Sequence, residues 1–155
     1  MSFAERIGIG ASAEQRAIAA FCAHGWCVIG HGLAQVGRLQ LPIITQAGEK
    51  PSTDFLALKR GDFRLIEVKS KFPLNIGGFG LDKGQWETLV EHDDLLPGSV
   101  ALVIEDRETD QMLVAQVSCL KLVATWSLNR RYVLFLREHF RPLDNFLMEN
   151  DEWLS

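Results

Sequence analysis

The chain has 155 residues, of which 47% are hydrophobic and 23% charged, and this fits one globular domain long enough to bury a core. Its net charge of −4 argues mildly against nucleic-acid binding, although the charge is uneven: residues 1–90 carry ten Lys or Arg against eight Asp or Glu, and residues 91–155 carry six against twelve. No apolar run reaches membrane-spanning length and the first ten residues do not resemble a secretion signal, so we expect a cytoplasmic protein without membrane contact.

The first predicted element is a helix from Ser12 to His24, in which Ser12 is a plausible N-cap and Gly25 ends the helix. Glu14 would lie in its first turn, where the helix dipole favours a carboxylate. A short strand is expected from Trp26 to Ile29.

Three cysteines, an odd number, fit a reducing compartment better than a disulfide framework. Cys22 and Cys27 are separated by four residues, but no second Cys or His pair follows at the distance of a zinc finger. We therefore expect buried thiols rather than zinc ligands.

The next segment, His31–Thr53, is long and irregular, with a polar turn at Gln46–Ser52. A loop of this length in a compact domain is usually functional or mobile. Because it leads into the charged hairpin that follows, we interpret it as a substrate-contacting segment that carries Arg38, Gln40 and Lys50. The alternative is a surface excursion in which Leu39–Ile44 forms an edge strand.

Two β-prone runs, Asp54–Leu58 and Phe63–Ser70, flank a charged turn that contains glycine, and they predict a β-hairpin. Glu67 and Lys69 are two residues apart, so their side chains leave the same face of the strand, and Asp54 on the paired strand reaches that face too. One interpretation is a cross-strand salt bridge on a solvated hairpin. The other is a site for a hard cation such as Mg²⁺, where Lys69 orients or deprotonates the attacking water or offsets charge on a phosphorane.

The rest of the chain alternates helices and strands. The expected elements are a Gly-rich loop at Phe72–Gly80, helices at Leu81–Leu95 and Ser118–Leu128, and strands at Ser99–Ile104, Met112–Val117 and Arg131–Leu136. The run at 99–104 is continuously apolar, as expected for a strand covered on both faces. From Arg141 the chain is acidic with a few large apolar residues, and we expect this part to be poorly ordered or to dock on a partner. The predicted organisation is one domain over residues 1–141 and an acidic C-terminal tail over 142–155.

Asp54, followed after a hairpin by Glu67-Val68-Lys69, resembles the motif of the PD-(D/E)xK nuclease superfamily. Glu14, in a helix followed by Gly25-Trp26 and a strand, is similar to the first helix of the archaeal Holliday-junction resolvases and their VRR-NUC relatives. Gln85, in the helix after the hairpin, is similar to a glutamine of those relatives. The resemblance covers roughly residues 12–104.

The resemblance implies an α/β fold with a restriction-endonuclease-like core, in which helices flank a mixed central sheet. It also implies a metal-dependent nuclease that hydrolyses phosphodiester bonds in DNA, with branched and single-stranded DNA as candidate substrates and RNA as an alternative, and by the same analogy a homodimer. The implied ligands of Mg²⁺ or Mn²⁺ are Asp54, Glu67, the Val68 carbonyl and, for a second metal or a bound water, Glu14. Lys69 would act on the attacking water or on the transition-state charge, and Gln85 would assist.

Two other functions stay open. The acidic second half of the chain favours a catalytically inactive module of the same fold that binds nucleic acid or a protein. In a third interpretation the fold is only a scaffold and the C-terminal tail binds a protein partner. The connection at 31–53 is longer than in typical resolvases, which puts the transfer of their substrate preference in doubt.

Overall fold

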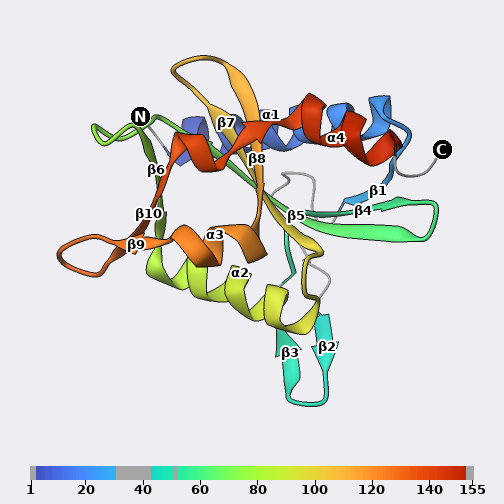
Figure 1. Ribbon diagram of the computed structural model, residues 1–155, viewed down its shortest axis with the longest axis horizontal. Helices are drawn as coiled ribbons and strands as arrows, with labels where there is room; N and C mark the ends of the chain where they lie inside the picture. Colours follow the sequence, from blue (N-terminus) through green and yellow to red (C-terminus); the bar gives the residue numbers. More distant parts are fainter. Residues whose placement is uncertain (1–2, 31–42, 51, 153–155) are drawn as a thin grey trace.

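A six-stranded mixed sheet forms the centre of the molecule, in a computed structural model that describes residues 3–30, 43–50 and 52–152 (Figure 1). Its strands, in spatial order, are β1 (Cys27–Gly30), β4 (Phe55–Lys59), β5 (Asp62–Lys71), β7 (Val100–Asp106), β8 (Gln111–Gln116) and β11 (Arg141–Pro142). β5 and β7 are parallel, and the other neighbouring pairs of this sheet are antiparallel. The expected α/β architecture with a mixed central sheet is confirmed.

Two helices cover each face of this sheet (Figure 1). α1 (Phe3–Ala23) and α4 (Leu143–Glu152) pack on one face, and α2 (Lys83–Leu95) and α3 (Val117–Val123) pack on the other. All seven residues of β7 are buried, because this strand lies between both layers of helices. The sequence interpretation of residues 99–104 as a doubly covered strand is confirmed, with the strand extended to Asp106. Within the described residues, no helix combines the length and the apolar character needed to cross a membrane.

The predicted hairpin is present as β4 and β5, with strand ends shifted by about one residue from those expected. Lys59 pairs with Asp62, so only Arg60 and Gly61 form the connection, and both have positive φ, 48° and 83°. Two consecutive residues with positive φ are typical of the type I′ turn that suits the twist of a two-residue hairpin. Asp54 lies immediately before β4 rather than inside it.

A second, three-stranded sheet was not predicted. It has the order β6 (Gly78–Asp82), β10 (Tyr132–Leu136), β9 (Thr125–Trp126), and η1 (Arg137–His139) follows it. The Gly-rich loop expected at 72–80 therefore ends at Gly77. Gly78 belongs to a strand because a Cβ there would lie 1.9 Å from the Phe135 carbonyl oxygen, so this glycine permits close strand pairing. Predicted strand 131–136 exists, but it belongs to this second sheet, and the helix expected at 118–128 is shorter.

The segment interpreted as irregular contains a small hairpin of β2 (Ile43–Thr45) and β3 (Gly48–Lys50). Its turn is limited to residues 46–47, so the polar turn expected over 46–52 is wrong in extent. Arg38 and Gln40 lie outside the described residues, as does the side chain of Lys50. Their role as substrate contacts stays a prediction.

The N-terminal helix begins at Phe3, so Ser12 is not its N-cap and Glu14 lies in the middle of the helix rather than in its first turn. The helix dipole therefore does not explain the carboxylate at position 14. Cys22 and Cys27 are exposed, which corrects the expectation of buried thiols.

The described part of the C-terminal tail folds onto the domain. Leu143, Phe146 and Leu147 of α4 are at most 1% exposed and belong to the core cluster beneath α1. Their spacing of three and four residues places them on one helix face. The expectation of a poorly ordered or partner-bound segment is wrong for these residues.

Candidate active site

Asp54 and the second half of β5 meet where β4 begins. Phe55 is the first residue of β4 and pairs with Ile66, so β5 continues past the end of its neighbour from Glu67 onward. The Val68 N–H donates a hydrogen bond of 2.8 Å to Asp54 Oδ2. The carboxylate thus takes the place of a strand partner for this backbone group, which fixes the orientation of Asp54 beside Glu67.

Glu67 and Lys69 point from β5 toward α2, away from the face that α1 covers. Lys69 Nζ lies 2.6 Å from Glu67 Oε1, and the two side chains are only 23% and 18% exposed. Both line a cavity of about 300 Å³ with residues from α2 and from the segment before β4: Ser52, Gly84, Gln85, Thr88, Leu89 and His92. Gln85, in the first turn of α2, therefore lies at the same cavity as Glu67 and Lys69.

The charges at this site perturb one another. Burial raises the pKa of Glu67 above its ordinary value and the charge of Asp54 raises it further, and the opposing effect of Lys69 does not compensate. Burial alone would lower the pKa of Lys69, but Glu67, Asp54 and Glu14 together outweigh burial and raise it. Lys69 is therefore an ammonium at neutral pH, whereas burial and the charge of Asp54 disfavour the charged form of Glu67.

We expect Glu67→Gln to increase the free energy of unfolding at neutral pH. The folded-state pKa of Glu67 lies above its ordinary value of 4.5. Its contribution to stability is therefore present below that value and is lost as the pH rises through the folded-state pKa. The gain from Glu67→Gln should grow as the pH rises from 4.5 through the folded-state pKa, which urea denaturation at several pH values measures. A variant less stable than wild type at pH 8 would contradict this assignment.

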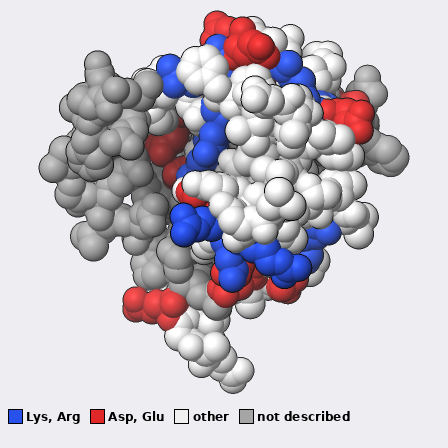
Figure 2. Space-filling view, turned by 90° about the vertical axis from the view of Figure 1, so that its left-hand side faces the viewer, with Lys and Arg blue, Asp and Glu red and all other residues white. Residues whose placement is uncertain are grey.

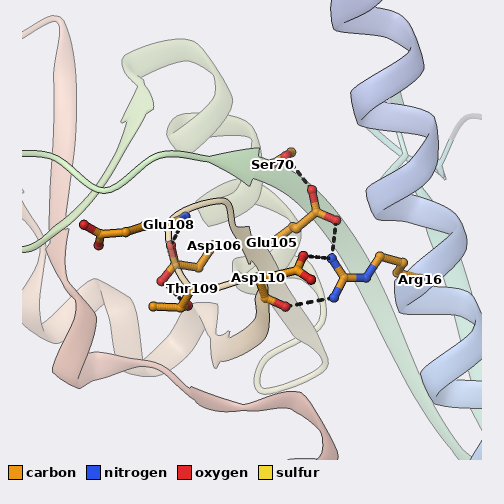
Figure 3. Close-up of polar contacts among 7 residues, drawn as sticks. All are labelled: Arg16, Ser70, Glu105, Asp106, Glu108, Thr109 and Asp110. Carbon is orange, nitrogen blue, oxygen red and sulfur yellow. Dashed lines mark hydrogen bonds and ion pairs between the residues drawn. The ribbon is translucent and has the colours of Figure 1, made fainter.

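An ion-pair network holds α1 against the sheet on the opposite face (Figure 3). Arg16 Nη1 lies 2.8 Å from Glu105 Oε2 and 2.8 Å from Asp110 Oδ1, and Arg16 Nη2 donates to the Asp110 carbonyl at 2.9 Å. Ser70 Oγ donates to the other oxygen of Glu105 at 2.8 Å. Since Glu14 lies two residues before Arg16, this network also fixes the segment of α1 that brings Glu14 within electrostatic reach of Lys69.

The donor set fits a hard divalent cation that is held only partly by the protein. In the described part of the chain, no three carboxylate, imidazole or thiol side chains are close enough to hold a metal ion by themselves. Mg²⁺, however, usually takes one or two carboxylates and keeps waters or phosphate oxygens in its remaining positions. Asp54 and Glu67, with the Val68 carbonyl, match that pattern. Glu14 does not complete a third-carboxylate group, so its role as a ligand stays a prediction.

No protein-family model matches the chain, and no curated protein matches its sequence. Among solved structures, it is similar to Hjc of Archaeoglobus fulgidus, described as a Holliday junction resolvase from an archaeal hyperthermophile. The TM-score is 0.61, over 89% of this chain and 99% of that chain. The chain has the fold of this resolvase. With 13% sequence identity, the likeness concerns the fold, and it confirms the restriction-endonuclease-like core that the sequence motif implied.

Within this fold, Asp54, Glu67, Val68 and Lys69 adjoin one another, and Gln85 lies across the cavity. The charge of Glu14, on α1, contributes to raising the pKa of Lys69. Sequence reasoning missed Ser52, Thr88 and His92, which also line the cavity. Thr88 and His92 follow Gln85 by three and seven residues, so helical periodicity starting from Gln85 would have placed them on the same face.

Proposed function

We propose that this protein is a metal-dependent nuclease that hydrolyses phosphodiester bonds in DNA. The observation that carries the proposal is the convergence of Asp54, Glu67 and Lys69 beside a polar cavity. They meet where β5 extends past the first residue of β4. Two carboxylates and an ammonium in a half-buried position are costly to maintain, and such perturbed groups cluster at functional sites.

Asp54, Glu67 and the Val68 carbonyl would hold Mg²⁺ or Mn²⁺. When bound, the cation supplies a Lewis acid that polarises a phosphoryl oxygen and offsets charge in the transition state. The hydrogen bond from Val68 N–H keeps Asp54 in one orientation before substrate arrives, so this ligand needs little reorganisation.

Lys69 acts as a charge stabiliser rather than as a base. Its pKa is raised by Glu67, Asp54 and Glu14 against the opposing effect of burial, so it keeps its proton at neutral pH. An ammonium donates hydrogen bonds to the non-bridging oxygens on which negative charge develops. Of the two roles that the sequence left open for Lys69, this is the one that the electrostatics favour. Gln85, on the opposite wall of the cavity, orients the attacking water.

Cleavage assays test the proposal. End-labelled four-way-junction, single-stranded and duplex DNA would be incubated with Mg²⁺, Mn²⁺ or EDTA, using wild type beside Glu67→Gln. We expect cleavage that requires metal and disappears in the variant, whose fold is checked by its unfolding curve. Because the similar solved structure is that of a Holliday junction resolvase, branched DNA is the first substrate to test. Absence of cleavage on every DNA and on RNA would contradict the proposal.

The second candidate is an inactive module of the same fold that binds nucleic acid. The observation in its favour is the close pair of Lys69 and Glu67, 2.6 Å apart, because it neutralises both charges without a metal. DNA binding without metal-dependent cleavage would distinguish it from the nuclease. A partner bound through Leu143, Phe146 or Leu147 of the C-terminal segment loses its basis, because these side chains are buried in the chain's own core.

A further inference from the structure

We propose that the loop from Phe72 to Gly77, together with Arg107, binds the bases of unpaired nucleotides that flank the bond to be cleaved. This inference rests on the proposed function for the location of that bond, and it adds a substrate feature: single-stranded DNA beside the site. Phe72 would be the stacking residue, and Lys71 and Arg107 would contact the adjoining phosphates.

The loop continues directly from the candidate site. Glu67, Lys69 and Lys71 alternate along β5 and leave the same face of the strand, and the loop begins at the next residue. A polynucleotide that passes the cavity in this direction meets Lys71 and then the loop. Because Phe72 follows Lys71 directly, one extended polynucleotide can contact both the cavity and the loop.

Three large apolar side chains are exposed on this one short loop. Phe72, Leu74 and Ile76 are 59%, 43% and 52% exposed. Single exposed apolar residues are ordinary, but several on one loop indicate an interaction surface. No helix or strand that the structure describes buries any of these three side chains.

Backbone hydrogen bonds hold the loop in one conformation, so its apolar side chains are exposed in the folded protein. Gly77 N donates to the Leu74 carbonyl at 2.8 Å, and Leu74 N donates to the Gly78 carbonyl at 2.7 Å. Arg137 N donates to the Gly77 carbonyl at 3.1 Å, which ties the loop to the end of β10. A platform held in this way binds at a lower entropic cost than a loop that must first become ordered.

Arg107 makes the surface suited to a nucleic acid rather than to an apolar protein. Its guanidinium carbon lies 4.4 Å from the centre of the Phe72 ring, and its backbone N–H donates to the Lys71 carbonyl at 2.9 Å. One side of the ring therefore carries a cation, and the exposed remainder is available to a base. Aromatic side chains beside Lys or Arg are the arrangement by which proteins bind single strands.

The charge on this face is mixed, and it includes a row of cations along which a polyanion can bind. Figure 2 looks at the side of the molecule on which β6, β9 and β10 lie, and it shows a broken row of Lys and Arg side chains beside a hollow that holds Asp and Glu. Stacking on Phe72 requires a base that is not already stacked in a duplex, so the geometry selects single-stranded over blunt double-stranded DNA.

Fluorescence anisotropy in EDTA tests this inference apart from cleavage. The probes are a labelled oligothymidylate and a blunt duplex of equal length, and the variants are Phe72→Ala, Phe72→Trp and Arg107→Ala. We expect Phe72→Ala to weaken oligothymidylate binding about tenfold, with little change for the duplex, because a base–aromatic stack contributes on that scale. Phe72→Trp should restore binding, and Arg107→Ala should weaken it and flatten its salt dependence. Leu122→Ala, at an 86% exposed position on α3, is the matched control.

Unchanged oligothymidylate binding in Phe72→Ala would overturn the inference, and so would an equal loss on both probes. The molecular mass in solution is a further check. If it rises with protein concentration in wild type but not in Phe72→Ala, and DNA binding is the same in both, the loop is a contact between copies of this chain and the inference is overturned. The nuclease proposal is judged separately. Metal-dependent cleavage lost in Glu67→Gln supports it whatever Phe72 does, and a Phe72-dependent single-strand affinity without cleavage leaves the binding surface standing alone.

Discussion

Lys69→Ala is expected to lower the rate of DNA cleavage about 10²–10³-fold, the scale on which removing one preorganised donor to a transition-state oxyanion acts. The ammonium is largely buried, lies 2.6 Å from Glu67 and keeps its proton because its pKa is raised. Its loss also leaves Glu67 and Asp54 without their nearest compensating charge. Single-turnover cleavage at saturating protein with Mg²⁺ isolates this effect from DNA binding.

Two further variants sharpen that experiment. Lys69→Arg keeps the charge but changes its geometry, so it should retain part of the activity that Lys69→Ala loses. Lys121→Ala removes an exposed lysine that pairs with Asp93 and Asp94 on α2, and it controls for net charge. Full activity of a folded Lys69→Ala protein would remove the role assigned to this residue.

Phe146→Ala should lower the free energy of unfolding by about 3–5 kcal/mol, as expected for a large aromatic side chain removed from a core. Phe146 is 1% exposed and packs in the cluster that α1, α4 and the sheet share. The guanidinium of Arg141 also lies 4.8 Å from the centre of its ring. Domains of this size have about 5–15 kcal/mol of stability in total, so the variant should be close to unfolding at physiological temperature.

Urea denaturation of Phe146→Ala beside Met148→Ala measures this effect. Met148 is on the same helix but 53% exposed, so its truncation should change stability little. Equal stability of Phe146→Ala and wild type would mean that α4 does not belong to the core, and the tail would again be available to a partner.

The parts of the fold that the sequence predicted are those in which local signals agree. The hairpin was recognisable because two β-prone runs flank a charged turn with Gly61, and that turn forms with positive φ at Arg60 and Gly61. The central strand was recognisable because residues 100–104 of it are apolar throughout. Glu67 and Lys69 leave the same face of β5, as strand alternation predicted, and Gln85 lines the same cavity; their catalytic roles stay a prediction.

The remaining parts depend on contacts between distant segments. Gly78 and Gly80 look like loop residues, and only the approach of β10 explains why glycine suits a strand there. Gly10 lowers helix propensity by about 1 kcal/mol, so the start of α1 at Phe3 conflicts with local preference. For α4, the acidic composition concealed an apolar stripe at helical spacing, which Leu143, Phe146 and Leu147 already displayed in the sequence.

The two-residue connection between β4 and β5 bears on the order of events during folding. Pairing across this turn closes a very short loop, whereas the parallel pairing of β5 with β7 must wait for α2 to cross between them. We therefore expect Asp54, Glu67 and Lys69 to come together in water, before α2 docks over them. On this order the charges become buried only when α2 docks, and we expect a substitution that relieves their electrostatic cost to slow unfolding rather than accelerate folding.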